Sequence, residues 1–191
     1  MNITELSDSL QRLNWDLLPR PDKSDVWLRF GDVFAYVETR FSIKLLGDSV
    51  SIRTLNNFCC KEHHETAMEI HNITPSEYDL SSYMYRNSKR VKLPKTTGSG
   101  PAAQSITEST ETILQSFDYT SFLDKCLSNR PDIGLDHQMN HITALAIKGK
   151  YKTLMDYVDY FKEGNKLNFL EPVTLEIIDR ALAISLRNSD L

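Results

Sequence analysis

The sequence predicts an α+β fold, in which an N-terminal helix packs on a small antiparallel β-meander and a C-terminal helical bundle follows. Three observations predict it. Apolar residues recur at helical spacing near the N-terminus, polar and apolar residues alternate strictly over residues 37–45, and only helical periodicity occurs beyond residue 105. The chain has 191 residues, of which 40% are hydrophobic and 25% charged. Such a chain is long enough to bury one sizeable core or two smaller ones.

The first helix is expected from about Thr4 to Leu18. Thr4 or Asn2 is available to cap its first turn, and the Pro-Arg-Pro sequence at residues 19–21 ends it. One face of this helix carries leucine at every third or fourth position: Leu6, Leu10, Leu13 and Leu17. An amphipathic helix of this kind must bury its apolar face, and the sheet that follows in the chain is the nearest element to cover.

The meander is predicted by strict alternation, which places successive side chains on opposite faces of a strand. Gly31 and Gly47 are each followed by aspartate at positions where hairpin turns are needed. The residues expected to face the core are Val37, Thr39, Phe41, Ile43 and Leu45. The residues expected to face solvent are Glu38, Arg40, Ser42 and Lys44.

A basic stretch followed by small residues predicts a boundary in the chain. The run RNSKRVKLPK at residues 86–95 contains five basic residues and no acid, and TTGSGPAAQ follows it. Because this stretch shows no hydrophobic periodicity, residues 88–104 are expected to form a flexible basic linker or long loop. The linker divides an α+β part with the meander, residues 1–87, from a helical part, residues 105–191, that packs on the first.

Four helices are expected in the helical part. The first begins at the capping box of residues 105–108 and continues to Arg130-Pro131. The others are expected at His137–Lys148, Lys152–Glu163 and Thr174–Leu186, and the short connections between them are typical of antiparallel neighbours. A further capping box at residues 74–77 predicts a helix through about Tyr85 in the α+β part.

Residues 59–71, CCKEHHETAMEIH, gather potential metal ligands. A zincin helix needs His-Glu-x-x-His, but no second histidine follows His64-Glu65 at that spacing. The inverted motif needs a histidine where Cys59 stands, and a deaminase site needs a Cys-x-x-Cys pair that the sequence lacks. We therefore predict no metal site, although weak capture of metal stays open. A polar helix or strand edge is expected here, with Met68 and Ile70 packed inward.

No other stretch carries a catalytic signature. Cys126 with His137 or His141 offers a thiol–imidazole pair, but Cys126 lies on an apolar helix face, which favours a buried structural cysteine. The sequence has no phosphate loop, nucleophile elbow, kinase motif set or dinucleotide glycine pattern. We expect no catalytic residue, no cofactor-binding residue and no cofactor, and hence a protein that is not an enzyme.

Charge and hydropathy restrict the partners and the compartment. The net charge of −4 argues against a dedicated nucleic-acid-binding protein, which is usually basic. The N-terminus lacks a secretory signal pattern, and no run of about 18 apolar residues occurs, so no membrane partner is expected. The odd number of cysteines indicates free thiols. These features predict a cytoplasmic protein; its oligomeric state is left open.

One predicted helix face has the composition of a protein-binding surface. In the helix at residues 152–163, an apolar stripe is expected to be buried, and the opposite side carries Asp156, Asp159, Tyr160 and Glu163. Tyrosine is enriched at interfaces, and surrounding carboxylates suit a basic partner. These four residues are the predicted partner-binding site, with an ordinary solvated face as the alternative.

Two segments carry a resemblance to a known group of proteins. WLRFGDVFAYVETRFSIKLLGDSVSIRTLNNF, from residue 27, and HITALAIKGKYKTLMDYVDYFKEGNKLNFLEPVTLEIIDRALAI, from residue 141, resemble small bacterial α+β proteins encoded near polymorphic or type VI secreted toxins. Those proteins are regarded as cognate immunity factors. The resemblance implies a cytoplasmic, non-catalytic protein that binds and neutralises one toxin domain. Two alternatives remain: a secretion chaperone or adaptor, and a hydrolase or nuclease of unfamiliar type that uses residues 59–71 or the histidines at 137 and 141.

Overall fold

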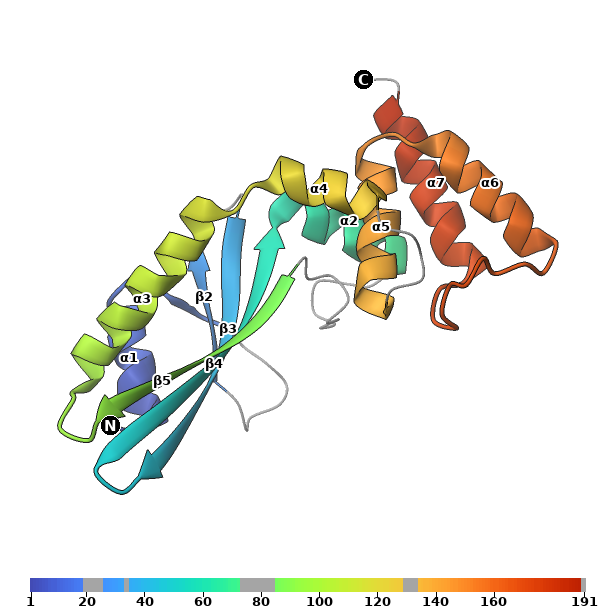
Figure 1. The fold of residues 1–191 in the computed structure, drawn as a ribbon. Helices are drawn as coiled ribbons and strands as arrows, with labels where there is room; N and C mark the ends of the chain where they lie inside the picture. Colours follow the sequence, from blue (N-terminus) through green and yellow to red (C-terminus); the bar gives the residue numbers. More distant parts are fainter. Residues whose placement is uncertain (19–25, 33–34, 73–84, 129–133, 190–191) are drawn as a thin grey trace. The chain divides into compact units, whose positions relative to one another are not determined.

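The fold is α+β, as predicted, and the chain forms two compact units (Figure 1). The computed structural model describes residues 1–18, 26–32, 35–72, 85–128 and 134–189. The first unit comprises Met1–Cys59 and Tyr85–Phe117, and the second comprises Cys60–Met84 and Asp118–Leu191. The helix predicted from residue 74 falls almost entirely outside the described residues, apart from Tyr85, which begins a strand.

The described strands of the first unit form one sheet in the order β1-β2-β3-β4-β5. They are β1 (Asp16–Leu17), β2 (Val26–Gly31), β3 (Ala35–Leu46), β4 (Ser49–Cys60) and β5 (Tyr85–Pro94). The turn predicted at Gly47 is confirmed, because this glycine connects β3 to β4 with a φ of 55°. β2 and β3 pair antiparallel, and the Asp32 amide, just beyond Gly31, donates to the carbonyl of Ala35, the first residue of β3.

Two helices of the first unit, α1 (Ile3–Gln11) and α3 (Ser99–Ser116), pack on the sheet. The buried core that they share with the strands contains Leu6, Leu10, Trp15, Leu28, Phe41, Val50, Ile52, Ala102, Ala103 and Ile106. The prediction that the N-terminal helix covers the meander is thus confirmed. The predicted extent is too long, because Asn14 adopts a left-handed φ of 64° and residues 16–17 pair with β2 instead. Leu17 is accordingly 54% exposed.

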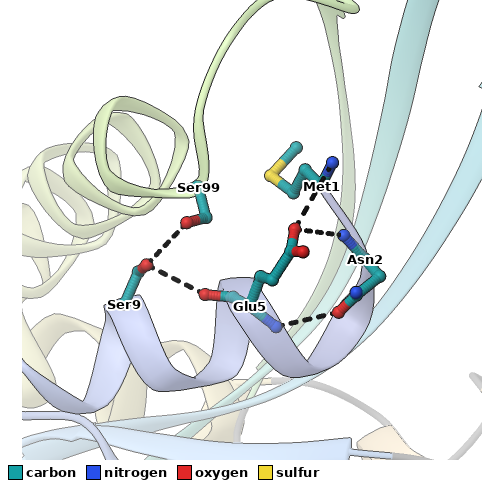
Figure 2. A network of polar contacts seen from close by, with 5 residues as sticks. All are labelled: Met1, Asn2, Glu5, Ser9 and Ser99. Atoms are coloured by element: carbon teal, nitrogen blue, oxygen red, sulfur yellow. Dashed lines mark hydrogen bonds and ion pairs between the residues drawn. The ribbon is translucent and has the colours of Figure 1, made fainter.

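The start of α1 is fixed by a capping box (Figure 2). The Glu5 amide donates to the Asn2 side chain at 2.9 Å, and the Glu5 carboxylate accepts from the Asn2 amide at 3.0 Å. The same carboxylate lies 3.4 Å from the Met1 amino group. Deeper in the helix, the Ser9 hydroxyl donates to Ser99 at 2.9 Å and joins α1 to the first residue of α3. Asn2, one of the two predicted caps, is the residue that caps the helix.

The predicted flexible linker at residues 88–104 is wrong. β5 pairs with β4 from Ser49↔Pro94 to Phe58↔Tyr85, and α3 begins at Ser99. Within the basic run, Arg90 and Lys92 are exposed, whereas Val91 and Leu93, which alternate with them, are half-buried. This is the period-two pattern of a half-buried strand. Gly98 is the N-cap of α3, and a proline is tolerated in a first helical turn. The predicted division at this stretch is therefore wrong too.

The faces predicted for β3 are correct at the centre of the strand and wrong towards its two ends. Val37, Thr39 and Phe41 are buried, and Arg40 is exposed. Glu38, however, is only 4% exposed, because the Arg29 guanidinium of the neighbouring strand lies 2.6 Å from its carboxylate.

At the other end of β3, Leu45 is 60% exposed, although it was predicted to face the core. The alternation along β3 places Leu45 on the same face as Phe41. However, Leu45 lies next to the β3–β4 turn and is not part of the described core.

The second unit is helical. Its described helices are α2 (Lys61–His71), α4 (Tyr119–Ser128), α5 (Leu135–Ile147), α6 (Tyr151–Lys162) and α7 (Leu175–Ser189). The last three agree closely with prediction. The single helix predicted from residue 105 is instead divided into α3 and α4 by the extended backbone at Phe117. Among the residues described, no helix combines the length and apolar character needed to cross a membrane.

Candidate protein-binding site

Helix α6 is amphipathic, and its apolar stripe is buried as predicted. Leu154 and Val158 are 0% and 5% exposed, and both belong to the core of the second unit. The rings of Tyr157 and Phe161 lie with their centroids 5.4 Å and 5.8 Å from that of Phe169. These contacts fix the rotation of α6 about its axis, so the residues on its other side must face solvent.

The four predicted site residues lie together on that other side. All four are exposed, and they line a shallow hollow of about 250 Å³: Asp156, Asp159, Tyr160 and Glu163. We call these four residues the acidic surface. The Tyr160 side chain is 44% exposed and lies among three carboxylates. The structure therefore brings together the residues predicted from helical spacing.

Met155 also belongs to this side of α6 and was missed by the sequence prediction. It is 47% exposed, and helical spacing places it one turn before Asp159. The signal was present, because Met155 is apolar yet falls outside the buried stripe. An exposed methionine next to Asp159 adds adaptable apolar contact area at the edge of the charged surface.

The acidic surface opposes the electrostatics of its own helix. Asp159 and Glu163 lie at the C-terminal end of α6, where the helix dipole is negative, and Lys162 is the basic residue of that turn. Asp156 and Asp159 are three residues apart, and Asp159 and Glu163 are four apart, so both pairs place like charges side by side. By these two effects the carboxylates lower the stability of α6.

Neutralising Asp159 and Glu163, the two acids at the C-terminal end of α6, is expected to stabilise the protein. The double substitution Asp159→Asn/Glu163→Gln should raise the free energy of unfolding by about 0.5–1 kcal/mol at low salt, because it removes both repulsive pairs and two unfavourable dipole interactions. Urea unfolding measures this change. Glu176→Gln, in the first turn of α7, is the control and should instead lower the free energy of unfolding. A loss of stability in the double variant would show that the acids support the fold.

A buried histidine ties α6 to its neighbours. His141 Nδ1 lies 2.8 Å from the Cys126 carbonyl oxygen, and His141 Nε2 lies 3.0 Å from the Tyr157 hydroxyl. Because a carbonyl can only accept, the ring proton sits on Nδ1, and Nε2 accepts from the tyrosine. Burial lowers the pKa of His141, although its bond to the Cys126 carbonyl acts in the opposite direction. Burial, followed by the charge of Asp156, raises the pKa of Tyr157.

The thiol–imidazole pair considered from the sequence is not the arrangement seen. His141 contacts the main-chain carbonyl of Cys126, and the thiol lies in an apolar cluster with Leu123 and Ala144. Cys126 is 4% exposed, and burial raises the pKa of its thiol to about 11. The interpretation of Cys126 as a buried structural cysteine is confirmed. His137, one turn before His141, is exposed.

Protonation of His141 is expected to make stability depend on pH. Its pKa is lowered in the folded state, so the unfolded chain takes up a proton first as the pH falls below about 6.5. The contribution of neutral His141 to the free energy of unfolding should be fully present above this pH. Below it the free energy of unfolding should fall, by at most about 1.4 kcal/mol per pH unit. Urea unfolding between neutral and mildly acidic pH measures the slope. His141→Gln should reduce this dependence on pH, and His137→Gln, at an exposed position, should leave it unchanged. Equal slopes for the unsubstituted chain and both variants would show that His141 does not cause the dependence.

Residues 59–71 form the end of β4 and the helix α2. Met68 and Ile70 are buried, at 8% and 0% exposure, as predicted. The ring of His63 is fully buried and packs edge-on against Phe122, with centroids 5.7 Å apart. Glu62 accepts a hydrogen bond from the Tyr119 hydroxyl at 2.9 Å. Within the described part of the chain, no three histidine, cysteine, aspartate or glutamate residues gather as a metal site would require. Metal independence of the protein stays a prediction.

Comparison with known proteins identifies a family. A family model described as a family of unknown function, DUF6990, matches residues 2–186. No curated protein and no solved structure matches the chain. The family match includes the sheet, both helices that pack on it and all but the last residues of α7. Because it spans nearly the whole sequence, the chain belongs to the DUF6990 family.

Proposed function

We propose that the chain is a non-catalytic, cytoplasmic protein-binding protein, and that it is an immunity protein that binds and neutralises a cognate secreted bacterial toxin. The acidic surface of α6 carries this proposal. It presents an exposed tyrosine among three carboxylates, on a helix whose stability those carboxylates reduce. An exposed tyrosine and three carboxylates that the helix does not need for its stability support a role in binding.

The chemistry of the acidic surface defines the partner. Asp156, Asp159 and Glu163 complement lysine and arginine side chains, and such complementarity accelerates the encounter of two proteins. Tyr160 offers a ring face to an arginine and a hydroxyl to a hydrogen-bonding group, at small cost in side-chain entropy. The partner is therefore a protein with a basic, arginine-containing surface. That it is a toxin domain is what the resemblance of the two sequence segments to immunity proteins supports.

The proposal is tested in two steps. The tagged chain is purified from its native host, and the protein that co-purifies is identified by mass spectrometry. That protein is then expressed in a laboratory bacterium alone and together with the chain. We expect it to stop growth when expressed alone and to be harmless in the presence of the chain. A co-purifying protein that is secreted but not toxic would contradict the immunity role and favour the alternative of a secretion chaperone.

A further inference from the structure

The sheet of the first unit has a second face that carries a cluster of cations. Successive side chains of a strand point to opposite faces, and Phe41, Val50 and Ile52 point into the core shared with α1 and α3. The residues that alternate with them along β3 and β4 point away from the core, and the β5 partners of those β4 residues do so too. Among the side chains that the structure describes, the exposed cations on this face come from three neighbouring strands: Arg40, Lys44, Arg53, Arg90 and Lys92. We call them the basic surface.

A hollow of about 190 Å³ lies within the basic surface. Arg40, Ser42, Arg53 and Leu55 line it. The Arg53 Nε atom donates to the Ser88 hydroxyl at 3.0 Å, which orients the guanidinium group and leaves its two terminal nitrogens available as donors. Two guanidinium groups and a hydroxyl around one hollow form a donor set suited to a carboxylate or phosphate group.

The cations of this face repel one another. Arg53 and Arg90 are direct partners in the β4–β5 register, and like charges directly opposite each other destabilise a sheet. Glu38, which β3 places on the same face, is already paired with Arg29. An anionic ligand would relieve the repulsion between Arg53 and Arg90. The sheet would therefore be more stable with such a ligand than without it.

We propose that the basic surface binds an acidic polypeptide segment, whose carboxylates are held at the hollow by Arg40 and Arg53. Half-buried Leu55 lines the hollow together with the two arginines, and its apolar side chain suits the aliphatic stems of glutamate side chains. Single-stranded nucleic acid also suits a basic strand face and is the alternative that the binding experiment distinguishes.

This inference goes beyond the proposed function. It concerns the first unit and a ligand of negative charge, whereas the acidic surface lies in the second unit and fits a positively charged partner. Failure of either proposal leaves the other intact.

Fluorescence anisotropy with the full-length chain tests the proposal. The probes are a labelled glutamate-rich peptide and a labelled single-stranded DNA of equal charge. We expect the peptide to bind, and the double substitution Arg40→Gln/Arg53→Gln to weaken its binding about tenfold or more, as expected for lost charge-assisted bonds. The control, Arg12→Gln/Lys148→Gln, removes the same charge from exposed positions outside the basic surface and should leave binding unchanged. Equal weakening in both variants, tighter binding of the DNA, or no binding of the peptide would each overturn the proposal.

Thermal unfolding provides a second readout that does not depend on the double variant. In the absence of ligand, Arg90→Gln should raise the melting temperature at low salt, because it removes the repulsion with Arg53. The glutamate-rich peptide should raise the melting temperature of the unsubstituted chain by more than that of Arg90→Gln. A peptide-induced shift that is the same in both proteins would contradict binding at the basic surface.

Discussion

Replacement of Tyr160 by alanine is expected to weaken binding of the co-purifying partner by about 2 kcal/mol or more, which corresponds to roughly a thirtyfold rise in Kd. The side chain is exposed and lies among the carboxylates of the acidic surface. Central aromatic residues of this kind contribute a disproportionate share of binding free energy, because they become fully desolvated in the complex. Isothermal titration calorimetry with the purified partner measures the change.

Leu186→Ala is the matched control for Tyr160→Ala. Leu186 has the same 44% exposure but lies on α7, so its removal should leave Kd unchanged. Both substitutions should alter the free energy of unfolding by no more than about 0.5 kcal/mol, as is usual for surface positions. A folded Tyr160→Ala protein that binds the partner with unchanged affinity would remove this residue from the interface.

Replacement of Trp15 by alanine is expected to lower the free energy of unfolding by about 3–5 kcal/mol, the range observed when large aromatic residues are removed from cores. Trp15 is 2% exposed, and its ring centroid lies 5.0 Å from that of Phe30 and 5.9 Å from that of Phe41. Its indole Nε1 donates to the Thr107 hydroxyl of α3 at 2.9 Å. The substitution removes ring contacts to β2 and β3 and leaves buried Thr107 without this donor. Urea unfolding followed by circular dichroism measures the loss.

Two further variants separate these contributions. Trp15→Phe keeps an aromatic ring but loses the indole donor, so it should cost less, about 1–3 kcal/mol. Leu17→Ala, two residues further on and 54% exposed, should change stability by no more than about 0.5 kcal/mol. A Trp15→Ala protein as stable as Leu17→Ala would show that this tryptophan does not organise the core of the first unit.

Features set by local periodicity were predictable from the sequence. The helices α5, α6 and α7 each carry a repeating apolar stripe, and their ends are marked by residues such as Gly149 with a φ of 60°. The acidic surface was predictable for the same reason, since its four residues lie within three turns of one helix. Helical geometry alone brings them together, and no distant contact is needed.

Features set by distant contacts were not predictable. From the sequence, the high positive charge of β5 predicted a linker. β5 is a strand because it pairs with β4, and in the chain α2 and residues outside the described part separate the two strands. The burial of Glu38 depends on Arg29, which pairs with it across two strands. In both cases the stabilising partner lies on a neighbouring strand, and the alternation within one strand does not identify the residue that pairs with it on another strand.

The basic surface has the same origin. Its five cations come from three strands, and in sequence they are spread from residue 40 to residue 92. The alternation in β3 indicated that Arg40 and Lys44 face solvent, but it gave no sign that Arg53 and Arg90 lie beside them. The β4–β5 register and the hollow that Arg40 and Arg53 both line show this proximity.

The central claim is that the acidic surface of α6 binds a basic protein. Its most direct test is the association rate of the purified partner with the Asp156→Lys/Asp159→Lys variant, measured at low and high salt. Glu108→Lys/Glu111→Lys, with the same spacing at exposed positions of α3, is the control. The account predicts association at least about tenfold slower at low salt for the α6 variant, with a weaker salt dependence, and an unchanged rate for the control. Equal association rates for the α6 variant and the unsubstituted chain would contradict it.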